Sequence, residues 1–394
     1  MRAVQVLHRE LKGHLGFLHA KTLAAFWRGV EGVPNADRLW LTALGRGLAG
    51  ACADKHRIKA ADRLLGNERL HRALIEIYRV LASYLVARIQ RPCVLVDWTG
   101  AGPDHHVITA SLSFQGRSLP IFSRVYADKQ KGSPKAQREF LQHLADVIPP
   151  NCKPIIITDA AFYFEWFEQV LALGWDFIGR LRGTTHIRVS NTWIPLTTLH
   201  RMAGRGPRDL GVVPVGRLRP RDLRVVLASK RRSKNRQSLT LKGIPRRDTN
   251  SRRSSKAARE PWVLATSVQC SARKVVVRYA LRMQLEECFR DLKAHRHGWS
   301  LDYVRSKTHQ RIEILLLVAA VALVAMHALG IAMERAKIHF GYQANTVRNK
   351  RVLSTFFLAR LVIRNGDAQQ FQANQVELAL VKLRDVLQQA SEPA

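Results

Sequence analysis

Three acidic residues stand where a carboxylate could take part in catalysis. Asp97 follows the apolar run VLV, and Asp159 follows IIIT, so we expect each acid at the carboxyl end of a strand. In open α/β sheets, functional groups gather at those ends. One such Asp is often only a helix cap or turn former, but two at matching positions make that explanation less satisfactory.

The third acid, Glu286, lies in the segment YALRMQLEECFRDLK, which we expect to be a helix. At 100° per residue this helix carries one stripe of side chains, which comprises Tyr279, Arg282, Glu286, Arg290 and Lys293. The spacing of Glu286 from both arginines is i,i+4, which is also ordinary on a solvated helix surface. The alternative is that Glu286 faces a metal site while the bases hold phosphates and Tyr279 donates a hydrogen bond or stacks.

Convergence of Asp97, Asp159 and Glu286 would present hard oxygen ligands without His or Cys, a set that favours Mg²⁺, with Mn²⁺ as a substitute. Two such ions about 4 Å apart can activate a water or a 3′ hydroxyl and stabilise the leaving oxygen of a phosphodiester. The chemistry would be hydrolysis and transesterification. His105 and His106 are alternative ligands, although we expect them on a hairpin surface.

The charge of the chain indicates a polyanionic partner. Its 394 residues include 64 Lys+Arg and 30 Asp+Glu, which gives a formal net charge of +34. A field of this sign attracts phosphate backbones, so we expect nucleic acid. An anionic membrane surface is the competing explanation, but no short amphipathic anchor carries the charge. The hydrophobic content of 46% indicates a globular chain of two to four domains.

Two further features bear on the compartment. The five cysteines are scattered without a Cys-x-x-Cys pair, and the N-terminus lacks an apolar signal core, so we expect a cytoplasmic protein with reduced thiols. Residues 314–333 are apolar over a membrane-spanning length. We expect a helix buried within a domain, because this is the sole candidate span and it follows a polar helix in a basic chain.

The pattern of elements changes along the chain. Residues 1–88 read as helices, and one of them projects a basic set that could contact DNA as in helix-turn-helix modules or be ordinary surface: Lys55, His56, Arg57, Lys59 and Arg63. From residue 93 the expected order is three strands, with a turn at Gln115-Gly116, then a helix, a strand, a helix and a strand. Residues 217–259 hold 16 Lys+Arg, which indicates a solvated loop or an insertion that grips DNA.

Several motifs together resemble the bacterial insertion-sequence transposases of the insertion sequence four family, and its insertion-sequence-ten branch most. They are the spacing Tyr279-(2)-Arg282-(3)-Glu286-(6)-Lys293, LVDW around Asp97, TDA around Asp159, GWDFIGRLRG, PWVLATS, EECFRDLK, QANTVRNKRVLST and KHRIKAADRLLGN. The resemblance covers most of the chain and is weakest over residues 185–258.

The resemblance implies an α/β fold with a ribonuclease H-like (retroviral integrase-type) catalytic core, a mostly β insertion, and helical N- and C-terminal regions. The implied division is a DNA-binding domain (1–88), a core in two parts (89–184 and 261–335), a basic insertion (185–260), and a helical C-terminal region with a possible dimer contact (336–394).

The implied activity is that of a DDE transposase, the enzyme of a mobile genetic element. It would use two ions per site for cut-and-paste transposition: end nicking, hairpin formation, hairpin opening and strand transfer. The implied partners are double-stranded DNA, as terminal inverted repeats and target, and a second copy in a synaptic homodimer, without a membrane. Trp262 matches the family tryptophan that receives a flipped base, although a core Trp is the ordinary alternative. Met283 stands where some members carry an aromatic wedge.

Three rival functions stay open. A nuclease of the same fold would cleave without strand transfer, a repressor would bind DNA with an inactive site, and a membrane protein would use residues 314–333 as a span. Joined product, metal-dependent cleavage and fractionation without detergent separate these possibilities.

Overall fold

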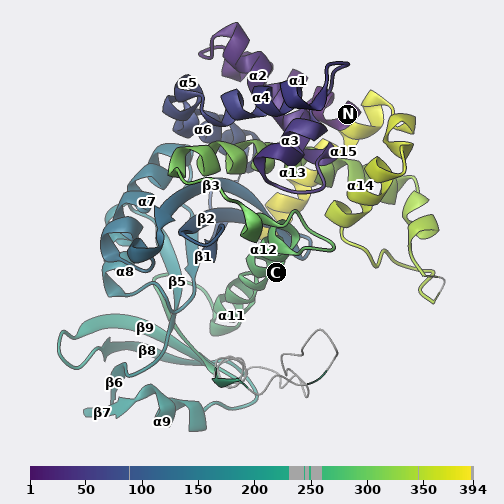
Figure 1. The fold of residues 1–394 in the computed structure, drawn as a ribbon. Helices are drawn as coiled ribbons and strands as arrows, with labels where there is room; N and C mark the ends of the chain where they lie inside the picture. The colour runs from purple at the N-terminus through teal and green to yellow at the C-terminus, as the bar shows by residue number, and fades with distance from the viewer. Residues whose placement is uncertain (88, 230–243, 245–247, 250–259, 345, 392–394) are drawn as a thin grey trace. The chain divides into compact units, whose positions relative to one another are not determined.

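The computed structural model describes residues 1–87, 89–229, 244, 248–249, 260–344 and 346–391. The chain divides into two compact units. The first consists of Met1–Pro154 with Leu281–Pro393, and the second is Ile155–Ala280. Each is described by itself, with the element labels of Figure 1.

The first unit begins with helices, as the sequence predicts. Their bounds are α1 (Arg2–Lys12), α2 (Ala20–Asn35), α3 (Leu41–Gly47), α4 (Asp54–Leu65), α5 (Glu68–Arg72) and α6 (Leu74–Val86). Glycines let α3 pack closely on its neighbours, since a Cβ at Gly45 would lie 2.5 Å from the Ile58 Cα in α4. The same argument holds for Gly47, where a Cβ would lie 2.4 Å from the Gly32 carbonyl oxygen of α2.

An antiparallel set of strands follows, in the order β3-β2-β1. The strands are β1 (Cys93–Gly100), β2 (His105–Phe114) and β3 (Arg117–Ala127). The predicted turn at Gln115-Gly116 is confirmed, with φ of 43° and 81°, because a two-residue hairpin turn with left-handed backbone matches the strand twist. Helix α7 (Pro134–Val147) comes next, and the Ser133 hydroxyl caps it by accepting from the Ala136 N–H at 3.2 Å.

The remainder of the first unit is helical: α12 (Met283–Lys293), α13 (His309–Arg335), α14 (Thr355–Arg364) and α15 (Ala373–Ser391). Helix α13 is long and apolar enough to cross a membrane, yet its apolar window is completely buried inside the protein. It packs against β3, α2, α14 and α15, which confirms the prediction of a buried core helix (Figure 1). Gly330 allows the approach of α14, because a Cβ there would lie 2.2 Å from the Thr355 carbonyl oxygen.

The second unit combines a sheet with a few helices. Its strands run in the order β4-β5-β10-β9-β8-β6-β7, and β4 and β5 are parallel. Their bounds are β4 (Ile155–Thr158), β5 (Asp176–Leu181), β6 (His186–Val189), β7 (Thr192–Pro195), β8 (Arg208–Val215), β9 (Arg221–Ala228) and β10 (Trp262–Thr266), with α8 (Phe164–Ala172), α9 (Leu196–Arg201) and α11 (Ala272–Ala280). The α/β class is therefore confirmed in this unit.

Two local expectations are wrong. Asp97 is not at the end of its strand, because β1 continues to pair with β2 through Gly100 opposite His106. The helix expected over residues 279–293 is interrupted: α11 ends at Ala280, and α12 begins after a turn at Leu281 and Arg282. The N–H groups of Gln284 and Leu285 there bond three residues back, to the carbonyls of Leu281 and Arg282.

Two other expectations stay predictions. The five-part division is untested, although the strands observed among residues 185–229 have the β character expected of the insertion. Most of the basic segment 217–259 lies outside the described residues, because only 217–229, 244 and 248–249 belong to the described part.

Candidate active site

Asp97 lies within β1, opposite Thr109 of β2. Its side chain is 13% exposed, and its Oδ1 accepts a hydrogen bond of 2.8 Å from the backbone N–H of Trp98. The apolar run before Asp97 is buried, as expected for a strand inside a covered sheet. The rigid strand therefore fixes the position of the Asp97 carboxylate.

Glu286 is carried by α12, which is docked onto the β2–β3 hairpin by polar contacts at two places. The Gln284 Oε1 accepts from the Ser113 hydroxyl at 3.0 Å and from the Phe114 N–H at 2.9 Å. Five residues beyond Glu286, Asp291 accepts from the Arg117 Nε at 2.6 Å. Helix α12 packs against β2 and β3 (Figure 1), and the two polar contacts set its rotation about its own axis. Glu286 then lies on the open side of the helix, with its side chain 43% exposed.

Burial shifts the pKa values of two ionisable groups on the inner side of α12. Burial raises the pKa of the Cys288 thiol to about 12. Burial also raises the pKa of Asp291, although the Arg117 guanidinium opposes that shift. Where an ion pair and a raised pKa coincide, desolvation outweighs the attraction. The helix therefore has a closed face toward the hairpin and an open face that carries Glu286.

Arg282 connects the two acids. One guanidinium nitrogen lies 2.8 Å from the Asp97 Oδ2, and the other lies 2.5 Å from the Glu286 Oε1. The Arg282 side chain is only 13% exposed. Asp97 and Glu286 are 189 positions apart in the sequence, yet they share one cationic group. The prediction placed Arg282 at DNA phosphates, whereas in this structure both carboxylates hold it.

This arrangement allows a test of whether a metal ion fits. Oxygens from two acids already converge on one positive charge, and carboxylate oxygens are the donors that Mg²⁺ and Mn²⁺ prefer. The donor set therefore suits a divalent cation in place of the guanidinium. Within the described residues, however, no group of three or more His, Cys, Asp and Glu side chains is arranged to hold an ion. The first unit thus brings together two of the three predicted ligands.

The other bases of the predicted stripe have separate places. The Lys293 Nζ lies 3.1 Å from the Asp302 Oδ1 and close to Gly100, at the end of the strand that carries Asp97. Arg290 is 68% exposed and lies 2.7 Å from Glu287. The expected i,i+4 pair of Arg290 with Glu286 is therefore replaced by an i,i+3 pair.

The remaining predicted site residues of the core lie in the second unit. Asp159 follows β4 directly, as expected, and its Oδ1 accepts from the Ala161 N–H at 2.8 Å. Trp262 begins β10 and is half-buried, with its ring edge-on to Tyr279 at 4.9 Å between centroids. Tyr279 is 2% exposed, so its visible role is to support the indole. A contact of either ring with DNA stays a prediction.

The basic residues of α4 divide into two kinds. Four are exposed, which are Lys55, His56, Lys59 and Arg63. Arg57 is instead engaged within the fold, because its guanidinium bonds Asp54 and donates to the carbonyls of Arg46 and Leu48 at 3.1 Å each. Arg57 thus ties the start of α4 to the end of α3. Its expected contact with DNA would require these bonds to break.

Sequence reasoning missed the residues that position the helix. No local pattern indicates the positioning roles of Gln284, Asp291 and Arg117, although Asp291 lies within the motif EECFRDLK, because these roles depend on a hairpin far away in sequence. The two histidines near Asp97 also differ from expectation. His105 is 6% exposed and packs edge-on to His309, so a surface position is wrong for it. His106 bonds the Asp128 carboxylate at 2.7 Å.

Paired acid oxygens at a half-open site suit enzymes that act on phosphodiesters with metal ions. A comparison with protein families agrees with this class: the model of the transposase DDE domain matches residues 93–324. This match covers more than half of the chain, so the protein belongs to the transposase DDE domain family. A comparison with curated proteins finds no match.

Family membership fixes the coarse properties of the protein. It implies a polynucleotidyl transferase that acts in transposition, binds DNA and, as these enzymes generally do, uses divalent metal ions. The α/β structure is consistent with the ribonuclease H-like core of such transposases. The matched range includes Asp97, Asp159 and Glu286.

Proposed function

We propose that this protein is a cut-and-paste DNA transposase of the insertion sequence four family, most similar to its insertion-sequence-ten branch. Its reaction sequence would be nicking of the transposon end, attack of the 3′ hydroxyl on the opposite strand to form a hairpin, opening of that hairpin by water, and joining of the 3′ end to target DNA. The observation that carries this proposal is the shared guanidinium of Asp97 and Glu286. Through Arg282, a carboxylate on a strand and a carboxylate on a helix contact the same cationic group, and a metal ion held by both acids would require the same proximity.

Asp97, Glu286 and Asp159 would hold two Mg²⁺ ions. When bound, the ions supply activation of the attacking oxygen and stabilisation of the leaving oxygen. Asp97 is suited to this role because its strand fixes it, and Glu286 because α12 presents it to solvent. Asp159, directly after β4, is proposed to complete the set when DNA is engaged.

The basic neighbours would then position the nucleic acid. Arg282, released from the two carboxylates, would turn to a backbone phosphate, for which a planar guanidinium provides two parallel donors. Lys293 would hold a second phosphate beside the end of β1. Trp262, supported by Tyr279, would receive the base that leaves the stack when the hairpin forms.

Three further assignments belong to this proposal. The exposed bases of α4 would contact the terminal repeat, and α4 with α3 would act as a helix-turn-helix pair. A homodimer would hold two transposon ends together, with residues 336–394 as the contact. The protein would act in the bacterial cytoplasm at the nucleoid.

The decisive experiment incubates the purified full chain with a labelled transposon end and Mg²⁺, followed by strand analysis on denaturing gels. We expect nicked ends, then hairpins, then product joined to a target plasmid. Cleaved ends without joined product would identify a nuclease of the same fold. Binding without cleavage in Mg²⁺ or Mn²⁺ would identify a repressor with an inactive site, and either result would overturn the proposal.

A further inference from the structure

Two neighbouring cavities in the first unit form a concave surface that the function above has not used. The first, of about 460 Å³, is lined by residues 34–38 at the end of α2 and just beyond it, by residues 295–297 after α12, and by part of α14. The second, of about 710 Å³, is lined by residues 40–42, Tyr303, residues 305–307 and Arg311. We call the two cavities together the basic groove.

The two cavities are adjacent, because side chains of one lining contact side chains of the other. Arg38 of the first cavity lies 5.2 Å from the ring centre of Trp40, which lines the second. His295 of the first lies 5.6 Å, between ring centroids, from Tyr303 of the second. The Arg38 guanidinium and the His295 Nε2 are 2.8 Å apart, which joins the two contacts. A basic and aromatic ridge therefore runs between the cavities, and an extended ligand could cross both.

The groove is strongly cationic, and part of that charge is unpaired. Among the described residues, four of its exposed side chains make no hydrogen bond or ion pair: Arg296, Arg305, Lys307 and Arg364. Among the described residues that line the two cavities, Asp37 is the single one with a carboxylate. Like charges repel, so such a set is unfavourable unless a ligand neutralises it.

A half-buried arginine also lies among these cations. Arg360, in the first cavity, donates to the carbonyls of Gly298 and Asp37. Burial is the main cause that lowers the pKa of Arg360. Among the nearby charges, Arg364 and Arg38 lower this pKa further, whereas the carboxylates of Asp37 and Asp291 raise it.

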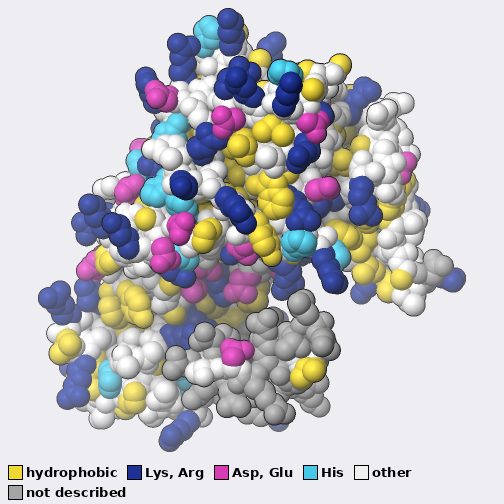
Figure 2. Space-filling model, in the orientation of Figure 1, with side chains coloured by type: hydrophobic (Ala, Val, Ile, Leu, Met, Phe, Trp, Pro, Cys, Tyr) yellow, Lys and Arg dark blue, Asp and Glu magenta, His cyan; other side chains and the backbone are white. Residues whose placement is uncertain are grey.

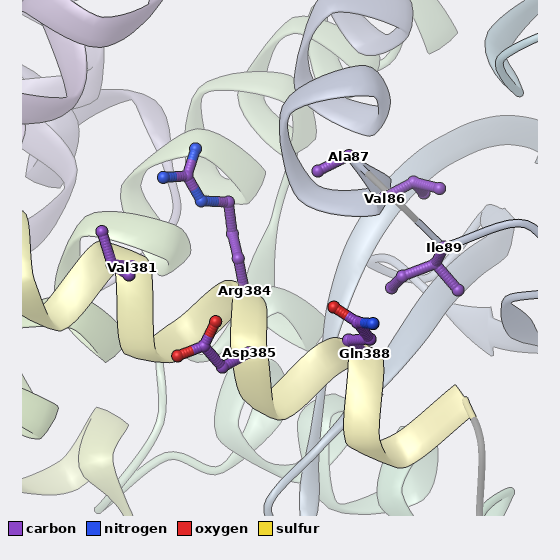
Figure 3. Close-up of a pocket in the computed structure, with 7 residues that line it drawn as sticks. All are labelled: Val86, Ala87, Ile89, Val381, Arg384, Asp385 and Gln388. Carbon is purple, nitrogen blue, oxygen red and sulfur yellow. The ribbon is translucent and has the colours of Figure 1, made fainter.

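A different cavity provides the contrast. The cavity between α6 and α15, of about 260 Å³, presents one guanidinium, Arg384, and one carboxylate, Asp385 (Figure 3). Its charges balance, so nothing there calls for an anion. Lys and Arg are also spread widely over the face shown in Figure 2. The basic groove is distinct because its cations line a concavity and four of those described make no hydrogen bond or ion pair.

The position of the groove connects it to the acid pair. Its segment 295–297 follows α12 directly, and the rise along α12 from Glu286 to Lys293 is about 10 Å. Since one strand of duplex DNA carries a charge about every 3.4 Å, this distance corresponds to roughly three nucleotides. Exposed Tyr303 adds an aromatic surface to the cations, as nucleic-acid grooves often have.

We propose that the basic groove binds the phosphodiester backbone of the DNA duplex whose scissile linkage lies at Asp97 and Glu286, about three or more base pairs from that linkage. This inference rests on the proposed function, since that function supplies the duplex. A single small anion would leave most of both cavities unfilled. A backbone crossing the ridge would pair with the unpartnered cations on both sides.

The test compares two double variants of the full chain with a charge-matched control. The variants are Arg296→Gln with Arg364→Gln, and Arg305→Gln with Lys307→Gln. The control is Arg335→Gln with Lys382→Gln, because both residues are exposed at other places on the first unit. Binding of a 40-base-pair duplex is followed by fluorescence anisotropy at several salt concentrations, and unfolding temperatures confirm that each protein is folded.

Each groove variant should lose about tenfold in affinity at low salt, and its slope of log K against log salt should fall by about 2, because about 0.9 is lost per phosphate contact. The control should keep the wild-type slope. A second arm uses duplexes with one neutral methylphosphonate at successive positions. Neutral linkages at one set of positions should lower the affinity of the wild type for the duplex. The same linkages should not change the affinity of the groove variants.

The proposal would be overturned if the groove variants showed the same salt dependence of affinity as the control. It would also be overturned if the methylphosphonate duplexes weakened binding at the same positions in the variants and in the wild type. Binding of poly-glutamate that depends on these cations, with duplex binding unaffected, would also overturn it in favour of an acidic peptide. Its failure is distinguishable from failure of the proposed function. If the wild type cleaves transposon ends but the groove variants bind the duplex as the control does, only the proposal for the groove is refuted.

Discussion

Glu313 and Glu286 show two uses of a carboxylate beside an arginine in the same unit. Glu313, on α13, is 2% exposed. Its oxygens accept hydrogen bonds from the Val125 N–H at 3.1 Å and from Arg124 at 3.4 Å, and one of them lies 2.8 Å from the His71 Nε2. The Glu286 side chain is 43% exposed, and it pairs with Arg282.

The difference lies in what surrounds each charge. The Glu313 oxygens bond side chains of β3 and α5 and one backbone N–H. Removal of the carboxylate would therefore leave the donors of Arg124, His71 and Val125 without this acceptor. The Glu286 carboxylate is held by one side chain that can swing away, and one side of it faces solvent. A closed carboxylate network stabilises a fold, whereas an open one remains available to bind another cation. Substitutions should therefore affect stability at one place and activity at the other.

Replacement of Glu286 by Gln should produce the largest effect. We expect cleavage of the transposon end to fall by about 10³-fold or more, because an amide lacks the charge that holds a divalent ion. The unfolding temperature should change little, since the side chain is half-exposed. Single-turnover cleavage assays and thermal unfolding measure both quantities.

Glu287→Gln on the same helix is the matched control, because its pairs with Arg290 and Arg117 lie outside the acid pair. It should retain near-normal cleavage. Equal losses in the two variants would contradict the assignment of Glu286.

Replacement of Glu313 by Ala should reverse the pattern. Loss of a buried, fully bonded carboxylate should lower the free energy of unfolding by about 3 kcal/mol, since Val125, Arg124 and His71 lose their acceptor. Denaturant unfolding measures this change. Glu313→Gln keeps an acceptor for the Val125 N–H and should lose less. A variant as stable as the wild type would show that the network is not closed in solution.

Replacement of Arg282 by Gln should change metal binding moderately. In the absence of DNA, the guanidinium competes with a cation for Asp97 and Glu286, so its removal should tighten Mn²⁺ binding by about three- to tenfold, or roughly 1 kcal/mol. Isothermal titration calorimetry measures this affinity. Lys293→Gln, whose partner is Asp302, serves as control. Weaker Mn²⁺ binding in the Arg282 variant would show that Arg282 organises the carboxylates instead of competing for them.

The smallest effect concerns Asp291, on the closed face of α12. Its pKa in the fold is raised, mainly by burial, so its contribution to stability is fully present below the ordinary Asp pKa of 3.8 and is lost as the pH rises through the folded value. Asp291→Asn should remove this part of the pH dependence. Unfolding measured from pH 4 upward should therefore show a flatter decline in the variant. An identical slope would argue that the Arg117 pair dominates.

Local signals were enough for much of the first unit. The hairpin over residues 105–127 followed from alternating strands and a Gln115-Gly116 pair, whose left-handed backbone the turn requires. The burial of α13 followed from an apolar surface on all sides. These features depend on neighbours in sequence, so the sequence predicts them.

The errors arose where distant residues decide. Strand β1 runs past Asp97 because its pairing with β2 continues to Gly100, and the turn at Leu281–Arg282 interrupts a helix that periodicity alone would continue. Glu286 shares Arg282 with the distant Asp97, and Arg290 pairs with Glu287 instead.

The sequence by itself determined which residues could do the chemistry: acids after apolar runs, bases at helical spacing, and a net charge of +34 that selects a polyanion. Only the tertiary structure decided that Asp97 and Glu286 share Arg282, and that cations from three distant segments line one groove. The physical reason is that residue type and spacing fix the chemistry and the local backbone. Convergence depends on how strand, hairpin and helix pack, which no local pattern encodes.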